Sequence, residues 1–118
     1  MGFPRISIYK DLYDHYYFRL ADAEGETILT SVTYRLHSDC TYAIRTMRTV
    51  ILNKSCYQFQ GSVGNYYFTI FTRENITIAS SKYFRTLAGR EAGVELLQKI
   101  VPVAEVEDRS LFVKYIRV

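Results

Sequence analysis

The chain has 118 residues, of which 48% are hydrophobic and 23% charged, and it carries a net charge of +3. This composition excludes a disordered chain, and the length allows one hydrophobic core rather than two independent ones, so we expect a single domain over residues 1–118. The basic residues form no run longer than two, so the charge gives only weak support to a nucleic-acid partner.

Three strands are predicted in the first part of the chain. Apolar and polar residues alternate within each of them, which places Tyr17 and Arg19 together on one face of the second strand. Polar turns separate the strands, and Gly25 in the second turn supplies the positive φ that a tight hairpin needs. The strands are expected at residues 5–10, 16–21 and 26–31.

The pattern then changes to helical spacing. One stripe of apolar residues is spaced as on a helix and is expected to pack on the sheet, with Ser38 as the N-cap. Cys40 lies on this stripe, so we expect it to be a buried, inert thiol. The stripe consists of Cys40, Ala43, Ile44, Met47, Val50 and Ile51.

The second half repeats the first at an offset of fifty residues. Tyr16-Tyr17-Phe18 aligns with Tyr66-Tyr67-Phe68, and no gap is needed between residues 16–52 and 66–102. Asn75 replaces Gly25 at the turn, where it tolerates the same backbone conformation. We therefore predict internal repeats at 5–54 and 55–108.

The second helix and the tail complete the chain. Thr86 is the expected N-cap of this helix, and Pro102 marks its end. Two short alternating runs follow, at residues 103–107 and 111–118, with a turn between them. An alternating strand at a sheet edge invites pairing, so an extra C-terminal strand within 110–118 is predicted to mediate self-association.

These segments resemble the YegP-like proteins, small bacterial proteins of unknown function. The resemblance covers about residues 6–108 and implies an α+β fold. Two tandem β-β-β-α(-β) repeats would form one antiparallel-rich sheet with two helices packed on it and the C-terminal strands exchanged between repeats. The matching motifs are Ile8-Tyr9-Lys10-Asp11, Tyr16-Tyr17-Phe18-Arg19-Leu20, residues 25–31, Ser80-Ser81-Lys82-Tyr83-Phe84 and Ala92-Gly93-Val94.

The resemblance also fixes which strands would be shared. It implies that residues 55–60 end the first copy while opening the second, and that residues 103–107 return to the first copy. Ala43 and Thr33 stand where the family tends to have Gly, so the first helix is expected to pack less closely on the sheet. The family supplies no active site to carry over.

The sequence indicates no catalytic site, metal site or cofactor. His15 and His37 are the two histidines, and neither has a counterpart in the other copy. Two cysteines without a CxxC motif do not form a metal site by themselves. The N-terminus lacks the apolar core of a signal peptide and no segment approaches the about 20 apolar residues of a membrane span, so we expect a cytoplasmic protein with reduced thiols.

One repeated feature suggests a binding surface. Aromatic residues lie beside arginine after the third strand of each copy and along the second strand, and rings of this kind stack on bases or receive acidic groups. The alternative is that Tyr34 and Phe84 merely cover the edge of the core. The candidate residues are Tyr17, Arg19, Tyr34, Arg35, Tyr67, Tyr83, Phe84 and Arg85.

Three functions follow from these patterns. The first is a non-enzymatic interaction module that binds a protein or a second copy of itself. The second is a single-stranded nucleic-acid binder that uses the Tyr/Arg surface. The third is a small-ligand binder or enzyme that uses one repeat, with His37 as its centre.

Overall fold

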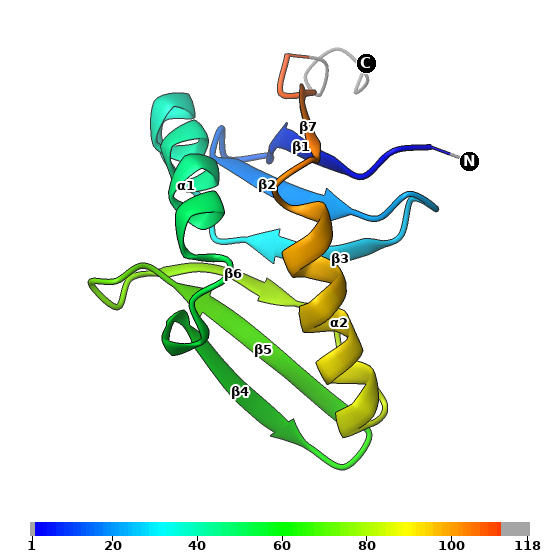
Figure 1. Ribbon diagram of the computed structural model, residues 1–118. Helices are drawn as coiled ribbons and strands as arrows, with labels where there is room; N and C mark the ends of the chain where they lie inside the picture. Colours follow the sequence, from blue (N-terminus) through cyan, green and yellow to red (C-terminus); the bar gives the residue numbers. More distant parts are fainter. Residues whose placement is uncertain (1, 112–118) are drawn as a thin grey trace.

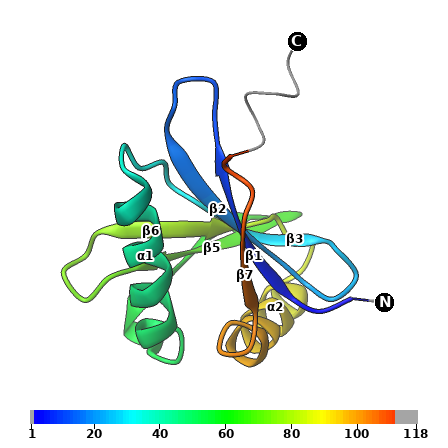
Figure 2. The same cartoon turned by 90° about the horizontal axis from the view of Figure 1, so that it is seen from above.

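The computed structural model describes residues 2–111 and shows one seven-stranded sheet with two helices on the same face (Figures 1 and 2). The strand order is β4-β5-β6-β3-β2-β1-β7, which confirms the predicted α+β architecture. The elements are β1 (Arg5–Lys10), β2 (Tyr16–Ala21), β3 (Thr27–Ser31), α1 (His37–Val50), the 3₁₀ helix η1 (Lys54–Cys56), β4 (Tyr57–Ser62), β5 (Asn65–Phe71), β6 (Thr77–Ser81), α2 (Leu87–Ile100) and β7 (Glu105–Asp108).

The two repeats share the sheet through exchanged strands. All neighbouring strands are antiparallel except β7, which runs parallel to β1. The chain leaves α1 for β4 at the far edge and leaves α2 for β7 beside the first strand (Figure 1). Each helix therefore crosses over the sheet, and the expected exchange of C-terminal strands is confirmed.

Matching hydrogen bonds hold the two copies in the same local shape. The buried N–H of Phe18 donates to Ser31 Oγ at 2.8 Å, and the N–H of Phe68 donates to Ser81 Oγ at 3.0 Å. These bonds satisfy backbone N–H groups just beyond the last paired residues, Arg19 with Thr30 and Thr69 with Ser80. The repeated serines, whose alignment the sequence shows, therefore complete the sheet.

The second turn of each copy has the expected backbone conformation. Gly25 has φ +89° and Asn75 has φ +68°, which confirms that asparagine replaces glycine in the left-handed region. Asp22 and Thr72 stand at equivalent places, and each accepts two backbone N–H groups across its turn. Two different side chains, a carboxylate and a hydroxyl, therefore make the same hydrogen bonds in the two turns.

The helices differ at their starts. Thr86 caps α2 as predicted, because its hydroxyl accepts from the N–H of Gly89 at 2.9 Å. The prediction of Ser38 as the N-cap of α1 is wrong. The N-cap is Leu36, whose side chain makes no capping hydrogen bond, and Ser38 lies inside the first turn of the helix. Helix α1 begins before the first residue of its apolar stripe. The isolated β-bridge between Tyr34 and Tyr16 holds the chain against the sheet just before the helix starts.

Two predicted strands are displaced along the chain. Lys54–Cys56 form the 3₁₀ helix, with the Asn53 side chain accepting from Ser55 N, so β4 occupies residues 57–62 rather than 55–60. The last described strand covers residues 105–108 rather than 103–107. Within the predicted C-terminal strand, Ser110 and Leu111 lie in a turn, and residues 112–118 fall outside the described part of the chain.

The single core lies between the helices and the sheet. Both apolar stripes face it, and Cys40 is buried there as expected. The largest fully buried side chains include Phe18, Phe68, Ile6, Ile8, Leu20, Leu29, Met47 and Leu97. Between residues 2 and 111, no helix lies over the other face of the sheet (Figure 2).

Candidate binding surface

A row of polar residues, one from each strand, crosses the uncovered face of the sheet. Side chains alternate along strands, so the residues between the core-facing ones point to this face. Each member of the row pairs directly with the next in the sheet register. From β7 to β4 the row contains Glu107, Ser7, Arg19, Thr30, Ser80, Thr69 and Gln58.

Two tyrosines and an arginine form a cluster at one end of this face. The rings of Tyr9 and Tyr17 stack with centroids 5.4 Å apart and planes 25° apart. The guanidinium carbon of Arg19 lies 5.5 Å from each ring centroid. Tyr9 and Tyr17 sit opposite each other in the register of β1 and β2, which is the geometry that lets cross-strand rings interact.

A second aromatic pair lies in the other half of the sheet. Tyr67 and Tyr83 meet edge to face with centroids 5.3 Å apart. Tyr83 is 66% exposed, although aromatic rings are usually buried. Thr30 and Ser80, whose side chains are short, lie at the centre of the face between this pair and the first cluster.

The charges on this face are largely paired. Arg5 lies 3.6 Å from the Glu107 carboxylate, which also lies 3.8 Å from Arg109. Arg19 has no carboxylate partner among the described residues, and its charge is instead placed over the two rings. Its charge is therefore left available to a partner.

The predicted binding residues do not all join this surface. Tyr34 and Phe84 pack against the core on the helix side, as the alternative interpretation held. Burial, followed by the charges of Cys40 and Asp39, raises the pKa of Tyr34 to about 12. Tyr17, Arg19, Tyr67 and Tyr83 are the candidates on the open face. The others, Arg35 and Arg85, are exposed.

Tyr9 is the member of the surface that sequence reasoning missed. It alternates with the buried Ile8 on β1 and comes opposite Tyr17 only through the strand register. The alternation along β1 can be read from the sequence. The pairing of β1 with β2, which brings the two rings together, cannot.

His37 belongs to a structural contact at the start of α1. Its Nε2–H donates to Asp108 Oδ2 at 2.7 Å, and Asp108 Oδ1 accepts from the Ser110 hydroxyl at 2.6 Å. The carboxylate therefore stands between the imidazole and the hydroxyl, whereas a histidine that activates a serine must lie beside it. Partial burial opposes ionisation of Asp108, but the bonds from Ser110 and His37 outweigh it and lower the pKa of this carboxyl.

Both halves of the chain match the domain of unknown function DUF1508, over residues 12–56 and 62–108. The chain belongs to this family. The UPF0339 protein PA0329 of Pseudomonas aeruginosa is 25% identical over 96 residues, which cover 80% of this chain and 87% of that protein. The resemblance to YegP-like proteins, which have no established function, is thereby confirmed.

Two solution NMR structures of family proteins have the same fold. The UPF0339 protein SO3888 from Shewanella oneidensis gives a TM-score of 0.87 at 21% identity, with 95% of this chain and 96% of that chain covered. The protein of unknown function YegP from E. coli gives 0.85 at 23% identity, with 93% and 96% covered. These DUF1508 relatives establish the architecture, and none of their descriptions names an activity.

Between residues 2 and 111, no group of three or more His, Cys, Asp and Glu side chains is arranged to hold a metal ion. In the same part of the chain, no helix has the length and apolar character needed to cross a membrane.

Proposed function

We propose that this DUF1508 protein is a non-enzymatic binding module that presents the open face of its sheet to a protein partner. The observation that supports this is the stack of Tyr9 and Tyr17 with Arg19 over both rings, on a face that no helix covers. Tyrosine and arginine are enriched among the residues that dominate binding energy at protein interfaces.

The charge distribution favours a protein over a polyanion. Arg5 is paired with Glu107, and the polar row contains one acidic and one basic side chain, so the face has no continuous basic stripe. The polar row gives hydrogen-bonding groups at its centre, and rings lie at both ends, which corresponds to the mixed polar and aromatic character of transient interfaces.

The side chains with catalytic potential are committed to structure. His37 is held by Asp108, and burial together with the Asp108 charge raises the pKa of the Cys40 thiol to about 12, so this thiol stays protonated. This supports a non-enzymatic role. The buried, free thiols also fit our proposal that the protein acts in the reducing cytoplasm.

A photo-crosslinking amino acid at Thr30 tests the proposal in the source cells. Thr30 is exposed at the centre of the open face, and Ser38, exposed in the first turn of α1, is the control position. We expect one discrete protein adduct from position 30, its loss with Arg19→Ala, and no equivalent adduct from position 38. The same adducts from both positions, or none from position 30, would overturn the proposal.

A second candidate ligand is single-stranded nucleic acid, and Arg19 is the observation that favours it. A guanidinium placed over two rings, without a carboxylate partner, offers both a stacking platform and a cation. Labelled oligonucleotides should then show a salt-sensitive shift that Tyr17→Ala and Arg19→Ala abolish. Arg35→Ala, at an exposed arginine outside the ring contacts of the cluster, is the control with the same change in charge as Arg19→Ala, and the absence of any shift at low salt ends this candidate.

A further inference from the structure

Two adjoining clefts lie between α1 and the β5–β6 hairpin. The first has a volume of about 330 Å³ and is lined mainly by apolar groups, including Tyr34, Ala43 and Ile78. The second has a volume of about 280 Å³ and is bordered by Arg45 of α1 and Arg73 of the hairpin. Because Tyr42 and Thr46 line both, the two clefts form one continuous groove.

We propose that this groove is a binding site for a small aromatic anion. The ring would occupy the apolar cleft, and the carboxylate or phosphate group would lie in the cleft bordered by Arg45 and Arg73. Ligand clefts of about 300 Å³ and above, with mostly apolar walls and a few placed polar groups, are the usual form of small-molecule sites.

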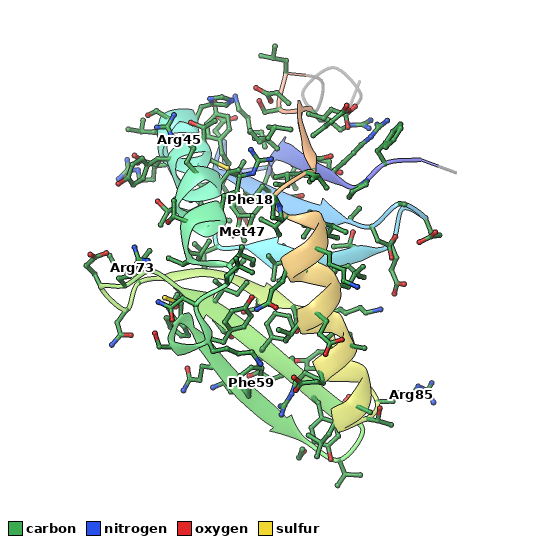
Figure 3. All side chains as sticks on the ribbon, in the orientation of Figure 1. Phe18, Arg45, Met47, Phe59, Arg73 and Arg85 are labelled. Carbon is green, nitrogen blue, oxygen red and sulfur yellow. The ribbon has the colours of Figure 1, made fainter. Side chains whose placement is uncertain are left out.

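The two arginines supply the anion-binding end. Neither has a carboxylate within ion-pair distance among the described residues, although Glu74 also borders this cleft. The Arg45 guanidinium lies 5.7 Å from the ring centroid of Tyr42. Figure 3 shows Arg45 projecting from the helix and Arg73 from the hairpin on the same side of the molecule. An anionic group placed here would gain charge-assisted hydrogen bonds from planar donors.

The apolar cleft fixes the position of the ligand's ring and the orientation of its anionic group. Ala43 and Ile78 are 8% and 1% exposed, so they form a closed floor. The Tyr34 hydroxyl has no hydrogen-bond partner in the described part of the chain and remains a donor. Asp39 stands at the rim of this cleft and repels an anion, so the anionic group is directed toward the arginines.

The groove has residues from both copies, and the repeated fold offers one equivalent place, between α2 and the β2–β3 hairpin. At the fifty-residue offset, Ala92, Glu95, Leu96 and Ala23 replace Tyr42, Arg45, Thr46 and Arg73. The equivalent place therefore carries neither the two cations nor the exposed ring. Substituting the residues found at the equivalent positions would remove the site. The fold already accepts these residues at those positions.

Backbone NMR shifts on titration with phenyl phosphate and benzoate test the proposal. We expect shifts confined to residues 39–46 and 72–78, with weaker effects from phenol and from inorganic phosphate. The double change Arg45→Glu/Arg73→Ala, which takes the residues found at the equivalent positions Glu95 and Ala23, should weaken binding at least tenfold, and the circular dichroism of the variant verifies its fold. Arg19→Ala must leave the titration unchanged, which separates this site from the open face.

Three results would overturn the site. The first is no shift with either aromatic anion at millimolar concentration. The second is equal shifts with inorganic phosphate alone, which would show anion adsorption without use of the apolar cleft. The third is a titration that the double change leaves as it was.

Discussion

The ring of Phe84 lies directly against Gly93 of α2. A methyl group added at Gly93 would stand 2.5 Å from Phe84 Cζ and 2.8 Å from Cε1. The ring has little room to withdraw, because its other side stacks on the buried Phe68 with planes 10° apart. In the first copy the equivalent pair is Tyr34 and Ala43, so the two helices meet their aromatic neighbours with different side chains.

We therefore expect Gly93→Ala to destabilise the protein by about 1–3 kcal/mol through overpacking, even though alanine is the better helix former. Denaturant unfolding measures the change. Ala43→Gly is the matched control, with an expected loss of about 1 kcal/mol from helix propensity alone. Adding Phe84→Leu should recover part of the loss, and a Gly93→Ala variant as stable as the parent would contradict this packing.

The turn at Gly25 provides a second test, because the other copy contains its natural replacement. Gly25→Asn should be nearly neutral, since Asn75 takes the same left-handed conformation at φ +68°. Gly25→Ala should lose about 1 kcal/mol or more, because its Cβ is strained at φ +89° even though no atom lies nearby. Thermal unfolding compares the two, and equal losses would contradict a conformational cause.

The contact between His37 and Asp108 predicts a pH dependence of stability. The pKa of Asp108 is lower in the folded protein than its ordinary value, so its stabilising effect is present above about pH 4 and is lost as the pH falls through the folded pKa. Both side chains are over a third exposed, so Asp108→Asn should cost only about 0.5 kcal/mol near neutral pH. In urea unfolding, the difference in free energy of unfolding between Asp108→Asn and the parent should narrow toward pH 3. A difference that stays constant with pH would contradict this prediction.

The thiol of Cys40 should be unreactive in the native protein. Burial, with the nearby Asp108 charge, raises its pKa to about 12, and the residue is fully buried. Because the thiolate is the reactive form, a thiol reagent at pH 8 should leave Cys40 unmodified until denaturant is added. Mass spectrometry with Cys56→Ser isolates this site, and rapid modification of the native variant would show that α1 opens from the sheet.

Local patterns were sufficient to predict most of the fold. Alternation, the helical stripes and the fifty-residue offset located β1, β2, β3, β5, β6 and both helices, whereas β4 and β7 are displaced by two residues, and Gly25 with Asn75 identified a repeated turn. Tyr17 and Arg19 were placed on one face for the same reason. The exchange of the terminal strands followed from the family resemblance, since no local pattern encodes which distant strand a segment joins.

The remaining features depend on tertiary contacts. Ser38 has the right chemistry for a cap, but the bridge between Tyr34 and Tyr16 fixes where the chain enters α1. Arg45 and Arg73 lie far apart in the sequence, and only the crossover of α1 toward the second copy places them along one groove. The sequence neighbours of Tyr34 and Phe84 do not show whether these two rings are exposed. Both residues therefore fit a binding surface as well as the edge of the core.

Arg90 covers part of the free edge of the sheet. Its guanidinium carbon lies 5.0 Å from the ring centroid of Phe59 and 5.6 Å from that of Tyr66, and it donates to the Gln60 carbonyl at 3.1 Å. The strand β4 has six residues and no charged side chain, whereas the opposite edge, β7, has four residues of which three are acidic. Charge discourages edge pairing, so β4 is the edge that needs protection.

Replacing Arg90 should therefore affect both stability and association. Arg90→Ala is expected to lose about 1–2 kcal/mol in unfolding experiments, because two ring contacts and a hydrogen bond disappear. It should also sediment as larger species than the parent at high concentration, because the β4 edge is uncovered. Arg85→Ala, at an exposed residue outside these contacts, is the control. If the Arg90 variant loses stability but sediments like the parent, the guanidinium stabilises the rings without protecting the edge.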